Sequence, residues 1–280
     1  YLRMSDLRIL SLGAGVQSST LALMIEKGEV PMVDACIFSD TGAEPKRVYE
    51  WLSWLEKQLS FPVYKIVNKN GSLTENLIKA NKGEYVRGTT IPMYTRDKVT
   101  GKKGILRRQC TATYKIEPIT QKIRELLGVQ YKQKVPKDYK VTQYFGISMD
   151  EISRMRISTY HYINFEYPLI DKKMRREDCI KWMLDNKFPK PPRSACTYCP
   201  YHSNEEWLNI KKDKEEWDAV VKLDKQLRTG LYKCQPEKYN YYLHRSGQPL
   251  DEVDFSNEKN SKQLDMEFGF ENACEGMCGV

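Results

Sequence analysis

The sequence predicts an α/β fold in which helices cover both faces of a parallel sheet, and three observations lead to this prediction. Short apolar runs at 7–12, 33–39 and 62–67 are typical of buried strands. Segments with helical periodicity separate these runs, which is the alternation that parallel sheets require. A Gly-rich turn at 11–15 joins the first strand to the first helix.

The remaining elements follow in chain order. Pro45 occupies a favoured first-turn position of the second helix. A further strand is expected at 140–147. Residues 81–109 lack periodicity and are predicted to form a mobile loop over the site, and residues 250–280 to be irregular. Helices are predicted at 17–26, 45–59, 72–80, 116–127, 175–186 and, as one or two helices, 204–227. We expect a nucleotide-binding domain at 1–190 and a cysteine-rich lobe of helical and irregular structure at 191–280.

Composition narrows the class of protein. The 280 residues include 45 basic and 37 acidic side chains, which give a formal net charge of +8. Such an excess favours attraction to phosphate, either of a nucleotide or of a nucleic-acid backbone, although a solvated surface would show it too. No apolar run approaches the roughly 20 residues of a membrane span, and no leader is apparent. We therefore expect a cytoplasmic protein without a membrane partner.

The turn after the first strand has the features of a phosphate cradle. Gly13 and Gly15 would let the backbone approach an anion closely, and Ser18, Ser19 and Thr20 offer hydroxyl groups in the first turn of the helix. The turn matches neither a Walker A loop nor the dinucleotide fingerprint. An ordinary strand-to-helix turn would have a similar sequence.

Polar residues also follow the second predicted strand, in the segment FSDTGAEP at 38–45. Ligands of open α/β sheets bind at the carboxyl ends of the strands. Asp40 is therefore a candidate to contact a ribose, a metal ion or the attacking group, although a generic loop uses the same residue types.

The eight cysteines suggest a thiol site. Cys196 and Cys199 stand two residues apart before Pro200, a spacing that suits a shared metal ion or a redox pair. In a reducing compartment disulfides are unexpected. Cys36 and Cys179 lie in apolar patterns and are expected to pack in the core.

Four segments together resemble the adenine-nucleotide α-hydrolase superfamily, and specifically its phosphoadenylyl-sulfate (PAPS) reductase branch. The run SLGAGVQS at 11–18 is similar to the PP-loop of that family, and 40–49 to its second-strand motif. The run from Gly146 to Arg154 resembles a third motif of the family. The cysteine segment 194–200, preceded by YPLID at 167–171, resembles the iron–sulfur members, which include the DNA-phosphorothioation enzyme.

The resemblance implies a Rossmann-like (HUP-type) fold that binds ATP or another adenine nucleotide, with Mg²⁺ as a candidate companion. Gln17 stands where the pyrophosphatase version of the loop has Asp, which brings the loop closer to the PAPS reductases. Residues implied to hold the nucleotide are Ser11, Gly13, Gly15, Gln17, Ser18, Ser19, Asp40, Thr41, Gly42, Arg107, Arg108, Gly146, Glu151 and Arg154.

The resemblance also implies a [4Fe–4S] cluster. Cys110 precedes a Lys-x-Glu-Pro sequence as a cluster ligand does in the family, and Cys196 and Cys199 would add two more thiolates. The tail offers Cys274 as fourth ligand and Cys278 as a candidate catalytic nucleophile, and their roles could be exchanged. Zinc bound by the same four sulfurs is the competing interpretation.

Two reactions fit these implications. The first is nucleotide-dependent sulfur transfer to DNA or tRNA, with a cysteine desulfurase or a thiol reductant as partner and Asp40 as a candidate catalytic residue. The second is attack of the Cys278 thiol on an adenylyl sulfate with release of sulfite. A third hypothesis, outside enzymes, is a nucleotide- or nucleic-acid-sensing protein with a structural cluster.

Overall fold

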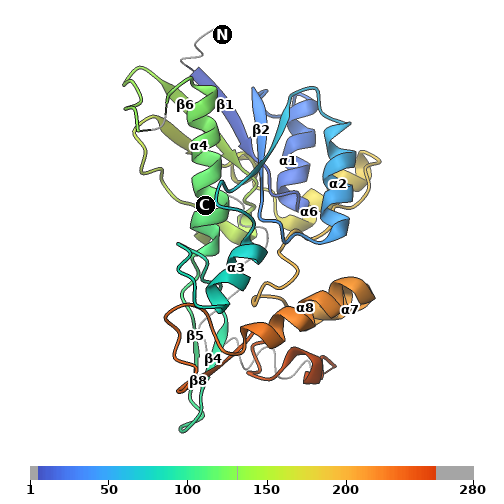
Figure 1. The fold of residues 1–280 in the computed structure, drawn as a ribbon. Helices are drawn as coiled ribbons and strands as arrows, with labels where there is room; N and C mark the ends of the chain where they lie inside the picture. The colour runs from blue at the N-terminus through green and yellow to red at the C-terminus, as the bar shows by residue number, and fades with distance from the viewer. Residues whose placement is uncertain (1–5, 131, 257–280) are drawn as a thin grey trace.

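The computed structural model describes residues 6–130 and 132–256 (Figure 1). Its centre is a five-stranded sheet of order β3-β2-β1-β6-β7 in which every neighbouring pair is parallel. The strands are β1 (Asp6–Ser11), β2 (Ala35–Asp40), β3 (Val63–Val67), β6 (Lys140–Phe145) and β7 (Ile163–Glu166). The predicted parallel α/β fold is confirmed.

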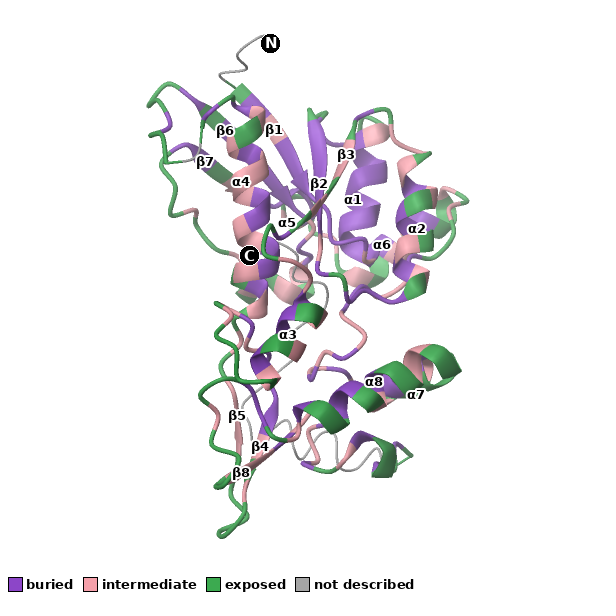
Figure 2. Ribbon diagram, viewed as in Figure 1, coloured by how far each residue is buried: buried purple, intermediate pink, exposed green. Residues whose placement is uncertain are grey.

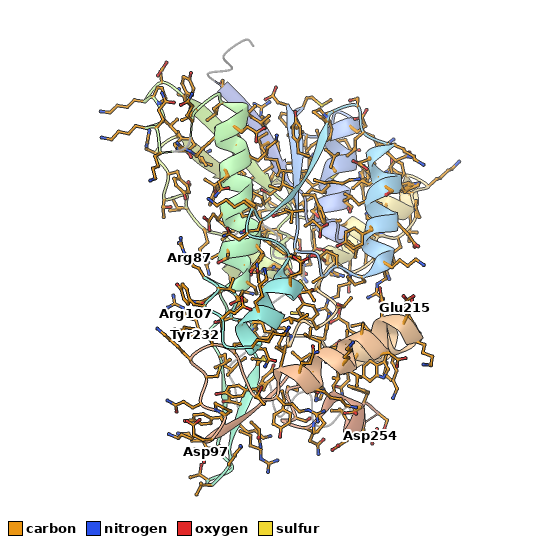
Figure 3. All side chains as sticks on the ribbon, viewed as in Figure 1. Arg87, Asp97, Arg107, Glu215, Tyr232 and Asp254 are labelled. Carbon is orange, nitrogen blue, oxygen red and sulfur yellow. The ribbon has the colours of Figure 1, made fainter. Side chains whose placement is uncertain are left out.

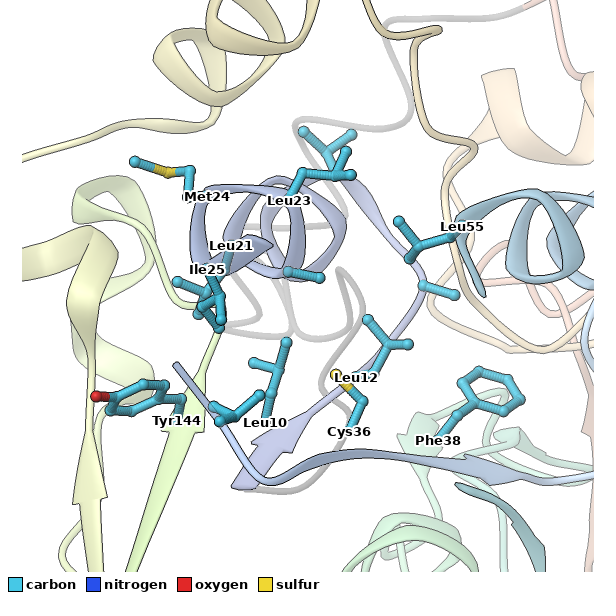
Figure 4. Packing of buried hydrophobic residues seen from close by; sticks show 14 of the residues in the cluster. Leu10, Leu12, Leu21, Leu23, Met24, Ile25, Cys36, Phe38, Leu55 and Tyr144 are labelled. Carbon is cyan, nitrogen blue, oxygen red and sulfur yellow. The ribbon is translucent and has the colours of Figure 1, made fainter. Parts of the chain in front are cut away.

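Helices cover both faces of this sheet because side chains alternate along each strand. Leu10 and Phe38 face one layer, formed by α1 (Val16–Glu26), α2 (Lys46–Glu56) and α6 (Arg176–Asp185), and Figure 4 shows part of this packing. The alternate residues, such as Ile9, Ile37 and Val141, pack against α4 on the other face. The helix α4 spans Glu117–Leu126, and the short α5 spans Pro168–Asp171. Cys36 and Cys179 are fully buried in the first layer, as predicted.

A second body lies below the carboxyl ends of the sheet strands (Figures 1 and 2). Its core joins α3 to Trp207, Tyr241 and other apolar residues that come much later in the chain. Its elements are α3 (Leu73–Asn81), α7 (Asn204–Lys211), α8 (Lys214–Leu227) and an antiparallel sheet of β5 (Lys103–Ile105), β4 (Tyr94–Asp97) and β8 (Tyr239–Tyr242).

The prediction of a loop throughout 81–109 is therefore wrong in its middle. β4 pairs with β5 and with β8, whose residues lie more than a hundred positions later, for example Tyr94 with Tyr242. Two strands from the first part of the chain thus complete a sheet in the second body. The domain boundary at 190 remains a prediction.

Short irregular turns complete the path: a π-helical turn at Ala112–Ile116 and 3-10 turns at Met149–Arg154 and Leu250–Glu252. No helix in the described residues is long and apolar enough to cross a membrane. The chain order reverses at β1, because β2 and β3 extend the sheet on one side and β6 and β7 on the other. A crevice at the carboxyl ends of β1 and β6 is therefore the expected ligand site.

Candidate functional site

The loop after β1 leads directly into the N-terminus of α1. Ser18 Oγ accepts a hydrogen bond from the backbone N–H of Gly13 at 3.2 Å, which folds the loop over the first turn of the helix. Gly15 is the N-cap residue that precedes α1, and no side chain caps the helix there. The N–H groups of a first helical turn have no partner within the helix, and the helix dipole favours an anion there. The loop predicted as a phosphate cradle thus has the required geometry.

The loop after β6 closes against this helix start. A Cβ atom built on Gly146 would lie 2.6 Å from both the N and Cα atoms of Ser18, closer than real Cβ contacts. Only glycine fits this approach, which brings two of the predicted nucleotide-binding segments together. A pocket lies between these two segments, at the start of α1. It is lined by Gly15, Val16, Gln17, Ser18, Gly146, Arg176, Arg193 and Ser194.

The pocket is small and is lined by two arginines, of which Arg193 is also ion-paired with Glu206 at 2.5 Å. Its volume is about 20 Å³, the scale of one water-sized group, so a phosphate would place an oxygen in it rather than be enclosed. Gln17 Oε1 accepts from Arg176 Nη1 at 3.1 Å, and Gln17 Nε2 donates to Ser148 Oγ at 3.3 Å. Among the lining residues two are arginines and none is a carboxylate. The lining therefore suits an anion and offers no ligand that Mg²⁺ prefers.

Ser194 stands out in this pocket. Its side chain is 2% exposed, and its Oγ atom has no hydrogen-bond partner among the described residues. A Cβ atom on Gly15 would lie 3.0 Å from this oxygen, so the hydroxyl stands directly over the start of α1. A buried hydroxyl without a partner carries a desolvation cost, which a ligand oxygen would remove.

Ser194 also lines a second cavity, of about 30 Å³, which contains the predicted metal ligands. Cys110, Cys196 and Cys199 all face this cavity, although about 86 residues separate the first from the second. The other lining residues are Thr41, Leu73, Ile91, Pro92, Arg108, Thr111, Lys115, Ala195, Tyr198 and Pro200. The structure thus brings together three cysteines that the sequence analysis grouped. Ser194 joins them to the pocket at the start of α1, which we call the phosphate pocket after its predicted ligand.

The thiol of Cys196 lies beside a buried charge pair. Glu44 Oε1 is 3.5 Å from Lys115 Nζ and 4.0 Å from Cys196 Sγ, and Thr41 Oγ1 lies 3.3 Å from the same sulfur. Burial, with a smaller contribution from the Glu44 carboxylate, raises the pKa of the Cys196 thiol well above its ordinary value. A thiolate at this position therefore requires a positive charge beyond Lys115, such as a metal ion would supply.

The turn that carries the cysteine pair is held from both sides. The backbone N–H of Thr197 donates to the carbonyl of Ala43 at 2.8 Å, which fixes the turn to the loop after β2. His202, which follows the cysteine pair, is 2% exposed. Its Nε2 atom lies 2.8 Å from the carbonyl oxygen of Cys196, and its Nδ1 atom 3.1 Å from Glu206. The turn geometry therefore depends on buried polar groups rather than on a metal alone.

Several predicted nucleotide ligands lie elsewhere or have structural partners. Asp40 Oδ1 accepts from the backbone N–H of Gly42 at 2.7 Å and from the Tyr49 hydroxyl at 2.8 Å, at the end of β2. Ser11 accepts from Gln143 beneath the sheet, and Ser19 accepts from the indole of Trp51, so both hydroxyls point away from the cradle.

The predicted arginines divide between different places. Arg107 is exposed, whereas Arg108 lines the cysteine cavity and stacks over Tyr201. Arg154 forms an ion pair with Glu151 in the turn after β6, and neither lines the phosphate pocket. Cys274 and Cys278 lie outside the described residues.

A metal centre is not complete within the described residues. No three His, Cys, Asp or Glu side chains in 6–130 and 132–256 form a group that could hold a metal ion. The three cavity thiols have the right chemistry for iron–sulfur or zinc ligation, but the present 30 Å³ has room for only about two waters. A four-iron cluster would need more room than this cavity has.

Polar and charged residues that sequence analysis did not assign to the site include Arg176, Arg193, Ser194 and Lys115, which line the two pockets, and Glu44, which pairs with Lys115. Two of them had a usable signal, since Arg193 and Ser194 come directly before the cysteine pair. The contribution of Arg176 depends on where α6 begins relative to α1, and this is a tertiary feature.

No family model matches the chain, and no curated protein matches it. Among solved structures, the chain is similar to a crystal structure of phosphoadenylyl-sulfate (PAPS) reductase from Candida auris in complex with phosphate. That similarity has 16% identity and a TM-score of 0.36, and it covers 67% of this chain and 75% of the other.

Proposed function

We propose that the protein is an adenine-nucleotide-dependent enzyme of the PAPS reductase-like kind that transfers sulfur to a nucleic acid. The observation that carries this proposal is the position of Ser194, which lines both the phosphate pocket and the cysteine cavity. A nucleotide whose phosphates contact the start of α1 would have its reacting group next to the thiols. Proximity of this kind is a principal source of rate enhancement.

The residues of the chain have distinct roles in this proposal. Backbone N–H groups of the first turn of α1, together with Arg176 and Arg193, neutralise phosphate charge, because guanidinium groups bind phosphate oxygens in pairs. The side chain of Ser194 donates a hydrogen bond to the same phosphate. Apolar neighbours such as Leu73 and Ile91 exclude water from the thiols.

A [4Fe–4S] cluster would be held by Cys110, Cys196 and Cys199, with Cys274 as the proposed fourth ligand. When bound, it would supply sulfur or electrons to the reaction. Anaerobically purified protein should then absorb near 400 nm and contain iron, and Cys199→Ser should lose both signals while Cys234→Ser, a matched control in the second body, keeps them. A colourless protein with stoichiometric zinc would contradict the cluster.

The reaction is tested with ATP, a nucleic acid, cysteine and a cysteine desulfurase, by following ³⁵S from the cysteine into the nucleic acid. We expect label to enter only when nucleotide is present. Label that enters equally without nucleotide, or never enters under conditions in which ATP binds, would contradict the proposal.

One observation favours a second candidate, an adenylyl-sulfate reductase. The phosphate pocket is lined by two arginines and no carboxylate, and Gln17 is engaged by Arg176 and Ser148. Thiol attack on the sulfur of an adenylyl sulfate breaks the S–O bond to the α-phosphate and releases the nucleoside phosphate, so no pyrophosphate departs that would need Mg²⁺ there. Release of sulfite from PAPS with a thiol reductant, abolished by Cys278→Ser, would support this candidate in place of sulfur transfer.

A further inference from the structure

An open groove with a volume of about 1090 Å³ lies on the α4 side of the molecule, outside the two pockets described above. Six of its lining residues are basic or histidine and one is acidic: Arg87, Arg124, Lys132, Lys134, Lys137 and His161, against Glu117. Figure 3 shows Arg87 and Arg107 on this same side of the molecule. The groove therefore carries a concentrated positive charge.

Three of these cations are available to a ligand. Arg87, Lys134 and Lys137 are exposed, and no ion pair or hydrogen bond of their side chains is found among the described residues. Arg124 has a different role, because its Nη2 donates to the carbonyls of Gln130 at 3.0 Å and Gln133 at 2.5 Å. Arg124 thus fixes the loop that carries the lysines against α4.

Aromatic rings stand at the other side of the groove. Tyr162 is buried, and its ring lies 5.7 Å from that of Tyr160 and 5.4 Å from that of His161 between centroids. Tyr160 is 43% exposed, and His161 is exposed as well. An anchored ring with exposed rings beside it provides a surface on which a flat base can stack.

The groove and the cysteine cavity share a wall. Ala112 and Ile116 line the groove, whereas Thr111 and Lys115 line the cavity, so the π-helical turn has one side in each. Gly88 packs against this turn, since a Cβ atom on it would lie 1.9 Å from Thr113 Oγ1. Its neighbour Arg87 lines the groove together with Ala112 and Ile116 of this turn.

We propose that this groove binds a single-stranded segment of nucleic acid, with Arg87, Lys134 and Lys137 on backbone phosphates and Tyr160 under a base. Cations that follow a backbone, interleaved with stacking rings, are the features of single-strand binding. A duplex is read by elements that protrude into its grooves, whereas this surface is hollow. This proposal rests on the proposed function in one respect: the bound strand is taken to be the nucleic acid that accepts sulfur.

The test is equilibrium binding of fluorescein-labelled 20-nucleotide single strands, one of DNA and one of RNA with the same sequence, to the full chain without nucleotide. The triple variant Arg87→Glu, Lys134→Glu, Lys137→Glu should bind at least about tenfold more weakly than the wild type. The slope of the logarithm of its binding constant against the logarithm of salt concentration should be smaller in magnitude by about 2. Each of the three lost phosphate contacts contributes about 0.7 to this slope for a single strand.

A matched triple variant controls for net charge. Lys57→Glu, Lys181→Glu and Lys190→Glu make the same change in charge at exposed lysines of the α2 and α6 side, and binding should stay near the wild-type value. Tyr160→Ala should weaken binding about tenfold, and Tyr160→Phe should not. Equal loss in both triple variants would overturn the proposal.

Two further arms separate the alternatives. A duplex of the same sequence and phosphatidylserine vesicles are tested in the same way. The proposal would also be overturned if either ligand bound more tightly than the single strand and the groove triple variant weakened binding of that ligand and not of the strand. ATP binding is measured on the same variants and should be unchanged. If ATP does not bind the wild type but single-strand binding is still lost in the groove triple variant, the proposed function fails and the groove proposal stands. If ATP binds but the groove triple variant binds the single strand normally, the groove proposal fails and the proposed function stands.

Discussion

Replacement of Ser194 by alanine gives the sharpest prediction, because nucleotide binding should weaken while the free energy of unfolding does not fall. The hydroxyl is 2% exposed and lacks a partner among the described residues, so its burial costs about 1–3 kcal/mol. Alanine removes this cost, and we expect the free energy of unfolding to stay unchanged or to rise by about 1 kcal/mol. Loss of a hydrogen bond to a charged phosphate, about 1.5–3 kcal/mol, should weaken nucleotide binding about tenfold to a hundredfold.

The matched control is Ser19→Ala, in the first turn of α1. Its hydroxyl is also buried, but it accepts from Trp51 Nε1 at 2.9 Å. Alanine would leave that indole without its partner and should lower the free energy of unfolding by about 1–3 kcal/mol. Stability is measured by urea unfolding, and binding by calorimetric titration of ATP and of PAPS. If Ser194→Ala loses stability as Ser19→Ala does and binds nucleotide normally, the hydroxyl is structural and the reasoning is refuted.

Three further changes have calculable outcomes. Gly146→Ala places a Cβ atom 2.6 Å from the backbone of Ser18, and an ordinary contact of about 3.4 Å requires the two loops to move apart by about 0.8 Å. We expect the nucleotide affinity measured by titration to fall at least about tenfold. Unchanged affinity would contradict the close approach. Burial lowers the pKa of His244 to about 3, so below about pH 6.5 the unfolded chain binds a proton that the folded chain does not. The free energy of unfolding should therefore fall by up to about 1.4 kcal/mol for each pH unit below that value. Urea unfolding at pH 4–7 should show this pH dependence in the wild type and not in His244→Asn. Asp224 is 1% exposed and accepts from Arg228 and from two backbone N–H groups, so Asp224→Asn should cost about 3 kcal/mol in the same assay, and a loss below about 1 kcal/mol would show that the network tolerates an amide.

The central sheet could be predicted because its strands are local signals. The apolar runs at 7–12, 33–39 and 62–67 became β1, β2 and β3 with ends shifted by two residues or fewer. The second sheet could not be predicted in the same way. β4 and β5 have four and three residues, and their partner β8 is remote in sequence, so no local pattern marks them.

The site was predictable to the extent that backbone motifs form it. The Gly-rich loop, Gly146 and the three cysteines come together as the motifs suggest. The charges around them could not be foreseen. Glu44 and Lys115 form a buried pair across two segments, and the Lys-x-Glu-Pro sequence that begins at Lys115 does not indicate Glu44 as its partner.

The most direct test of the account is a crystal structure of the complex with a non-hydrolysable ATP analogue or with PAPS. We predict a phosphate at the start of α1, with one oxygen within hydrogen-bond distance of Ser194 Oγ and another near Arg176. A nucleotide that binds with its phosphates elsewhere, for example among the lysines of the basic groove, would contradict the central claim.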